Sequence, residues 1–129
     1  MDDLLLSLEW LRFAEMDLSS AEFLLRHRPL PKEIICFHCQ QSVEKLLKGI
    51  LIINNTEAPR THDLRELFSQ IKDFVPNNNL IKSACIELDQ YSVQPRHPEE
   101  IHITEEDVHS AVKQAKKVLE FLKSLFPDA

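Results

Sequence analysis

The feature that most constrains the fold of this chain is its single glycine, Gly49, among 129 residues. Antiparallel sheets commonly use glycine in the tight turns of their hairpins, so a chain this poor in glycine has few such turns. Seven prolines and several clustered asparagines mark the breaks between segments instead. We therefore predict an all-α fold, an up-and-down helical bundle of about five helices.

Length and composition bound the organisation of this fold. A chain of 129 residues fits one domain with a real core, so we expect a single helical domain over 1–129. The apolar fraction of 43% and the charged fraction of 28% are ordinary for a globular protein, which argues against extended disorder. The net charge of −6 argues against broad, salt-driven adhesion to nucleic acid but leaves room for a local basic patch.

The compartment is predicted from three further observations. The first residues show no basic segment followed by a short apolar run, so nothing suggests export. No apolar run approaches the roughly 20 residues that span a bilayer. Three cysteines, an odd number, fit a reducing compartment better than a disulfide framework. We expect a cytoplasmic protein without membrane association and without a cofactor.

A first helix is predicted over about 3–26, and it is apolar on two sides. One stripe recurs at helical spacing and is expected to face the core: Leu4, Leu8, Leu11, Ala14, Leu18, Ala21 and Leu25. A second apolar zone follows on the other side: Leu5, Phe13, Met16, Phe23 and Leu24. Two interpretations of this zone are open, burial inside the bundle and use as a dimerisation surface.

Four more helices follow. Pro29 and Pro31 end the first helix, and a second then runs to about Ile53. A polar loop over 54–60 precedes a short helix with Thr61 or Asp63 as its N-cap. A fourth helix covers about 80–91, and an irregular connection follows over 94–103. Thr104 and Asp107 approximate a capping box that opens the last helix.

The second helix has two chemically different sides. At 100° per residue, one continuous arc is apolar and is expected to be core: Ile35, Cys36, Cys39, Val43, Leu46, Leu47, Ile50 and Leu51. The other side is polar: His38, Gln41, Glu44, Lys45 and Lys48, with Gln40 at the edge of the apolar arc. A solvated surface with Glu44 paired to Lys48 one turn later is one interpretation of this side; a binding surface is the other.

Cys36 and Cys39 form a C-x-x-C pair, but both lie inside the apolar arc and no second pair completes a zinc site. We therefore predict buried thiols and no metal. Gly49 costs roughly 1 kcal/mol relative to alanine inside a helix. We predict that a neighbouring helix, rather than a ligand, approaches the chain closely there.

Several of these elements together resemble the HEPN domain family. They are Trp10, Ala14 and Asp17 in the first helix, residues 37–48 (FHCQQSVEKLLK), residues 61–64 (THDL), and Tyr91 with residues 96–98 (RHP). The resemblance covers nearly the whole chain in order. It implies a helical bundle, usually a homodimer, often encoded beside a minimal nucleotidyltransferase.

The family resemblance implies two kinds of function. Some members are metal-independent endoribonucleases acting as toxins, with an arginine and, a few residues later, a histidine. Arg96 and His102 satisfy that pattern here with five intervening residues, and are the candidate catalytic pair. A histidine can move the proton of a ribose 2′-hydroxyl near neutral pH, and an arginine can bind the phosphate.

The other kind of function is a nucleotide- or nucleic-acid-binding accessory subunit. Its pocket is predicted from the polar side of the second helix and the THDL turn: His38, Gln41, Lys45, Lys48, Arg60 and His62. Backbone amides at the start of the helix near Asp63 would add to it. A structural interpretation is also open, in which His62 and Asp63 cap the third helix while Gln40, Gln41 and Glu44 tie helices together.

The leading hypothesis is thus a homodimeric HEPN protein that binds a nucleotide or nucleic acid and works with a minimal nucleotidyltransferase in a toxin–antitoxin-like module. The first alternative is a metal-independent endoribonuclease that uses Arg96 and His102. The second alternative is a helical interaction scaffold without a ligand, in which the second apolar zone of the first helix is the binding surface.

Overall fold

The computed structural model describes residues 2–76, 78–92, 99 and 102–128, and within these it contains five α-helices and no strand. Three helices are long: α1 (Asp3–Leu24), α2 (Lys32–Ile53) and α5 (Glu105–Leu122). Two are short: α3 (Leu64–Ile71) and α4 (Asn79–Leu88). Short 3-10 turns follow α4 and α5: η1 (Asp89–Tyr91) and η3 (Lys123–Leu125). The predicted all-α bundle is confirmed, with the end of the fourth predicted helix formed as a 3-10 turn.

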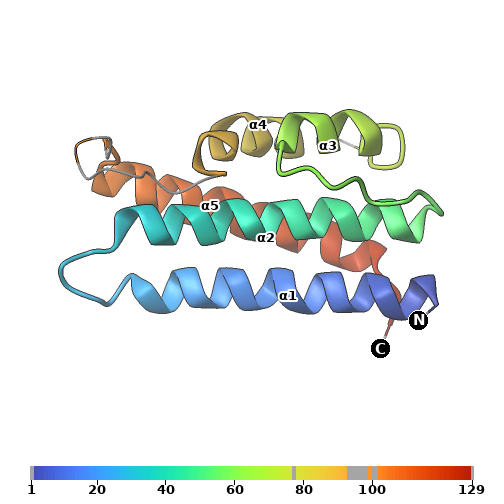
Figure 1. Ribbon diagram of the computed structural model, residues 1–129, viewed down its shortest axis with the longest axis horizontal. Helices are drawn as coiled ribbons and strands as arrows, with labels where there is room; N and C mark the ends of the chain where they lie inside the picture. The colour runs from blue at the N-terminus through green and yellow to red at the C-terminus, as the bar shows by residue number, and fades with distance from the viewer. Residues whose placement is uncertain (1, 77, 93–98, 100–101, 129) are drawn as a thin grey trace.

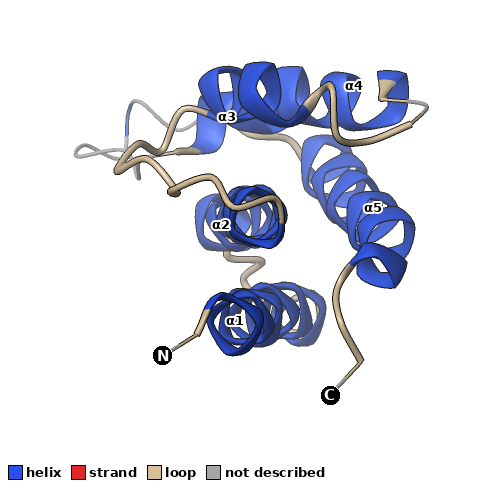
Figure 2. Cartoon of the chain, turned by 90° about the vertical axis from the view of Figure 1, so that its right-hand side faces the viewer, coloured by secondary structure: helices blue, strands red, loops and turns tan. Residues whose placement is uncertain are grey.

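The helix α2 lies at the centre of the bundle. It runs antiparallel to α1, with α3 and α4 on its opposite side (Figure 1). Viewed end-on, α2 sits between α1 and the α3–α4 layer while α5 closes one side (Figure 2). All eight residues of the predicted apolar arc of α2 are buried, which confirms that arc as core. None of the described helices is long and apolar enough to cross a membrane.

The connection between α2 and α3 runs back along α2 rather than away from it (Figure 1). The helix α2 ends at Ile53, yet His62 contacts Glu44, nine residues before that end. Nine helical residues span about 13 Å, so the loop retraces more than two turns of α2. This return places the THDL segment beside the middle of α2, where the polar residues lie.

Side-chain caps fix where three helices begin. Asp63 is the N-cap of α3 and accepts hydrogen bonds from the amides of Arg65 and Glu66. Thr104 and Asp107 form a complete capping box at the start of α5. Both predictions are confirmed. Asp2 caps α1 in the same way, accepting from the amide of Leu5.

The two apolar zones of α1 have different environments. Leu11, Ala14, Leu18 and Ala21 are buried as predicted, but Leu4, at the edge of that stripe, is exposed. In the second zone only Leu24 packs against the core. Leu5, Phe13, Met16 and Phe23 are exposed, so the interpretation that this zone is buried inside the bundle is wrong for them, and its use as a dimerisation surface stays a prediction. They lie on the outward side of α1, opposite the stripe that packs against α2.

The close approach predicted at Gly49 comes mainly from a side chain beyond α5. A Cβ atom on Gly49 would lie 2.6 Å from Cε2 of Phe126 and 3.3 Å from Cβ of Trp10 in α1. Phe126 follows η3 and is buried. The glycine thus lets the C-terminal segment and α1 pack against the same point of α2.

Candidate functional site

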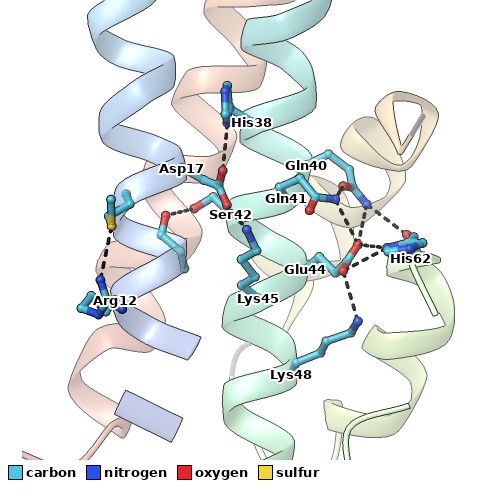
Figure 3. A network of polar contacts seen from close by, with 12 residues as sticks. Arg12, Asp17, His38, Gln40, Gln41, Ser42, Glu44, Lys45, Lys48 and His62 are labelled. Carbon is cyan, nitrogen blue, oxygen red and sulfur yellow. Dashed lines mark hydrogen bonds and ion pairs between the residues drawn. The ribbon is translucent and has the colours of Figure 1, made fainter. Parts of the chain in front are cut away.

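The polar residues of α2 form two separate networks on two flanks of the helix (Figure 3). One network joins α2 to the THDL segment and is centred on Glu44. The other joins α2 to α1 and is centred on Asp17. Each network includes partly exposed side chains of α2: Gln41 in the first, and His38 and Lys45 in the second. The predicted polar side is therefore an outward strip with a carboxylate-centred network along each edge.

The Glu44 carboxylate is buried and gathers donors from two segments. It accepts hydrogen bonds from Nζ of Lys48 at 3.1 Å and from Nε2 of Gln41 at 3.4 Å. Nδ1 of His62 lies 3.0 and 3.2 Å from its two oxygens. Because an ionised carboxylate only accepts, Nδ1 of His62 is the donor, and Nε2 is the ring nitrogen that is left available. Glu44 thereby sets the orientation of an imidazole whose side chain is 69% exposed.

Gln40 completes the attachment of the THDL segment to α2. Its amide, fully buried, donates to the backbone carbonyl of His62 at 3.0 Å. Its carbonyl oxygen accepts from Nε2 of Gln41 at 2.8 Å. A buried amide with both ends bonded stabilises one arrangement of the two segments. The predicted role of these glutamines in tying elements together is present in the structure.

Asp17 holds the second network between α1 and α2. Its two oxygens contact Nδ1 of His38 at 2.8 Å and Nζ of Lys45 at 2.5 Å. The same donor argument fixes Nδ1 of His38 as protonated and leaves Nε2 free to accept or bind. Next to it, the buried hydroxyl of Ser42 donates to the carbonyl of Ala14 at 2.8 Å. Three bonds thus lock the middle of α1 to α2.

Asp17 belonged to the family resemblance, but sequence reasoning gave it no place in the site. A signal was available, since Asp17 lies next to Ala21 on the helical wheel, at the edge of the buried stripe formed by Ala14, Leu18 and Ala21. A carboxylate at the edge of a core stripe needs a partner. The partners come from α2, 21 and 28 residues further along the chain.

The two lysines predicted to bind phosphate both have a carboxylate partner within the chain. Lys45 pairs with Asp17 and keeps 24% of its side chain exposed, with Nζ 6.0 Å from the ring centre of Phe13. Lys48 pairs with Glu44 and is 8% exposed, with Nζ 5.7 Å from the ring centre of Trp10. The interpretation of Glu44 and Lys48 as a solvated surface pair is wrong, because the returning THDL segment and Trp10 cover them.

The other predicted residues lie at the edges of this region. Arg60 and His62 are exposed on the returning loop, on the flank of α2 that carries Glu44. The amides predicted to offer an anion site at the start of α3 are engaged: Asp63 accepts from two of them, and Asp89 accepts from the amide of Leu64 at 3.0 Å. The accessible polar groups here are therefore side chains.

Arg96 lies outside the described residues. His102 is described, and it is exposed two residues before Thr104, the N-cap of α5. The pairing of Arg96 with His102 stays a prediction.

The three cysteines are buried and free, as the apolar arc predicted for two of them. Burial raises the pKa of Cys36 and of Cys85 to about 12, and it raises the pKa of Cys39 further. Thiols held neutral in this way are poor nucleophiles and poor ligands. In the described part of the chain, no three His, Cys, Asp or Glu side chains are grouped so as to hold a metal ion.

A central helix bonded by polar networks to both neighbours, within an all-α bundle, defines a class of small helical domain whose polar block is partly structural. The sequence matches the HEPN domain family over residues 7–125, so this chain belongs to that family.

Individual proteins are similar to this chain over most of its length. The chain is 30% identical to a protein of Methanocaldococcus jannaschii named "Putative toxin MJ1304", a match that covers 92% of this chain and 87% of that protein. It resembles the crystal structure of TT1696 from Thermus thermophilus, with a TM-score of 0.75 and 25% identity over 92% of this chain and 96% of the other. It also shares its fold with ST0689, an archaeal HEPN homologue, with a TM-score of 0.74 and 23% identity over 94% and 98% of the two chains.

Proposed function

We propose that this protein is the nucleotide- or nucleic-acid-binding subunit of a toxin–antitoxin-type module, a cytoplasmic homodimer that works with a minimal nucleotidyltransferase. The relative named as a toxin supports the class of module. The observation that carries the binding role is the outward strip of α2, where the partly exposed His38, Gln41 and Lys45 are each bonded to one of the two networks (Figure 3).

The strip offers groups that suit a phosphate and a base. His38 and His62 each have Nδ1 committed to a carboxylate, so Nε2 of each ring is available to a ligand. Lys45 keeps part of its side chain in solvent, and Arg60 extends from the returning loop. Lys48 contributes indirectly, because its ammonium donates to Glu44 and Glu44 in turn orients His62. A bound phosphate would compete with Asp17 for Lys45.

Binding is tested with calorimetry for ATP and GTP and with fluorescence anisotropy for a labelled single-stranded RNA. We expect Lys45→Met to weaken binding roughly tenfold, which is about 1.4 kcal/mol. Lys113→Met is the matched control, because Lys113 is an exposed lysine on α5. No heat and no anisotropy change with the wild-type protein, or equal losses in the two variants, would overturn the binding proposal.

The module itself is tested by expression in a bacterial host. We expect this chain alone to slow growth and co-expression of a minimal nucleotidyltransferase encoded beside it to restore growth. Co-purification of the two proteins would support the partnership. Unaffected growth together with no co-purification would remove both the toxin role and that partner.

A metal-independent endoribonuclease is the second candidate function. Its support is the toxin relative and the exposure of His102 just before α5. A solvent-exposed imidazole can transfer the proton of a ribose 2′-hydroxyl, with Arg96 as the predicted phosphate ligand. Cleavage of single-stranded RNA in EDTA should be lost in His102→Ala and in Arg96→Ala. It should persist in His109→Ala, an exposed histidine of α5. Uniform inactivity of the wild-type dimer would exclude this candidate.

A further inference from the structure

The outward side of α1 carries a row of large apolar side chains that nothing in the described chain covers. Leu5, Phe13, Met16 and Phe23 are 55, 44, 56 and 70% exposed. Single exposed apolar residues are ordinary on protein surfaces, but an aligned row along one helix indicates an interaction surface. The row runs from Leu5 to Phe23, so it extends along about 27 Å of the helix.

The outward residues repeat with the alternating three- and four-residue steps of a helix–helix seam. Reading along the helix and its two flanking ends, the seam is Asp2, Leu5, Glu9, Arg12, Met16, Ser19, Phe23 and Arg26. These positions lie opposite the buried stripe at 100° per residue. Side chains in the middle of the seam contact one another within one chain. Arg12 donates to Sδ of Met16 at 3.6 Å, and Cζ of Arg12 lies 4.6 Å from the ring centre of Phe13.

The seam is complementary to its own reverse. Two copies of α1 can be set antiparallel with the two-fold axis at position 14. The residues that then face each other have numbers that add up to 28. Leu5 then meets Phe23, Arg12 meets Met16, and Glu9 meets Ser19. At the two ends, the acidic Asp2 meets the basic Arg26. An interface between identical copies related by a two-fold axis requires this reciprocity, in which residue i contacts j and j contacts i.

A parallel arrangement fits worse. It would set Asp2 and Asp3 against their own copies at one end, and Arg26 and Arg28 against theirs at the other, which is repulsive at both ends. The antiparallel arrangement also opposes the two helix dipoles favourably. The charge pattern of α1 therefore selects both a second copy of this chain as the occupant and the direction in which it lies.

We infer that two copies of this protein associate through the outward faces of α1, antiparallel, with the two-fold axis passing near residue 14. This inference rests on the homodimer included in the proposed function and adds its surface and register. Phe13 lies on the side of α1 that faces Lys45 of α2. Because position 13 is next to the two-fold axis, the interface would bring the partner copy's Phe13 close to the same side, beside the Asp17–Lys45 pair.

A charge pair placed at Leu5 and Phe23 tests the surface and its direction together. Both side chains are more than half exposed, so their replacement should leave the fold intact, as circular dichroism would check. We expect the wild-type protein to be a dimer by light scattering at micromolar concentration, and Leu5→Lys and Phe23→Glu each to be monomeric. An equimolar mixture of the two variants should dimerise. The new lysine of one chain then faces the new glutamate of the other, while the native Leu5 and Phe23 meet on the other side of the axis.

A cross-link tests the register. In Phe13→Cys the two new thiols would be separated by about 3 Å along the helix axis, whereas the three native cysteines are buried and would not compete. Mild oxidation should give a covalent dimer from Phe13→Cys and none from Lys113→Cys, an exposed control position on α5.

Three outcomes would overturn the inference: a monomeric wild-type protein, a dimer that neither charged substitution affects, or a mixture that stays monomeric. Each can be separated from failure of the proposed binding role by repeating the RNA and nucleotide titrations on the same samples. Binding without α1-mediated dimers would sink the interface and leave the binding role standing.

Discussion

Replacing Glu44 by glutamine tests whether the polar block of α2 is a buried ionic network. The substitution keeps the shape of the side chain but removes the charge that Lys48 and His62 face. Lys48 has 8% of its side chain exposed, so its ammonium would be left nearly enclosed without a counter-charge. Removing one partner of a buried pair costs about 3–5 kcal/mol. Because glutamine still offers one acceptor oxygen, we expect a loss at the lower end, about 3 kcal/mol.

That loss is large against a total unfolding free energy of about 5–15 kcal/mol. With a urea m-value of about 2 kcal/mol per molar, the unfolding midpoint followed by circular dichroism should fall by about 1.5 M. Glu15→Gln is the control, because Glu15 also pairs with a lysine, Lys123, but both side chains are exposed and Glu15 lies outside the seam of α1; its midpoint should change little. A double variant that also carries Lys48→Met should recover part of the loss.

A small effect would refute this reasoning. If the midpoint of Glu44→Gln lay within about 0.3 M of the wild type, or if Lys48→Met added its own loss in full, Lys48 would not depend on Glu44. Lys48 would then have to find solvent or another acceptor in solution, and the predicted support of His62 through Glu44 would lose its basis.

Three further predictions concern packing, titration and capping. Gly49→Ala should lower the unfolding free energy by about 1 kcal/mol, since moving the Phe126 ring costs more than alanine gains in a helix; in a Phe126→Ala background the same change should stabilise, and a loss there would contradict the steric cause. Burial raises the pKa of Cys36 and Cys85 to about 12, whereas an unfolded thiol titrates at about 8.5. As the pH is raised, the unfolded state therefore loses these protons first, so the urea concentration at the unfolding midpoint should decrease from about pH 8 to about pH 10.5. Equal midpoints at the two pH values would count against buried thiols. Thr104→Ala should cost about 1 kcal/mol in the same assay by removing the cap of α5, while Ser83→Ala, at an exposed position, should cost nothing measurable.

Local patterns in the sequence were sufficient to predict most of the fold. The apolar arc of α2 and the caps at Asp63 and Thr104 depend on residues within a few positions of each other, and each was found as predicted. Helical periodicity also separated the two zones of α1, but it did not determine which zone the bundle covers. That depends on how α2 and α5 pack against α1, which spacing along one helix does not contain.

The candidate site was harder to predict because its contacts span long stretches of chain. Gln40 is fully buried rather than at an edge, since the carbonyl of His62 returns to it over 22 residues. The interpretation of Glu44 and Lys48 as a solvated pair is wrong for the same reason. Asp17 received no role because its partners His38 and Lys45 lie on another helix. Sequence spacing identified the polar residues of α2 but not the path of the loop that contacts Gln40 and Glu44.

The two networks divide the polar block of α2 into a buried part and an accessible part. The buried part is bonded within the chain, so replacing any of its residues should lower the free energy of unfolding whatever the protein binds. Its members are Gln40, Ser42, Glu44 and Lys48. His38, Lys45 and His62 have one side committed to a carboxylate and another facing outward. Substitutions at these outward groups should therefore alter a binding surface with little effect on stability, while the buried members keep α1, α2 and the returning loop in one arrangement.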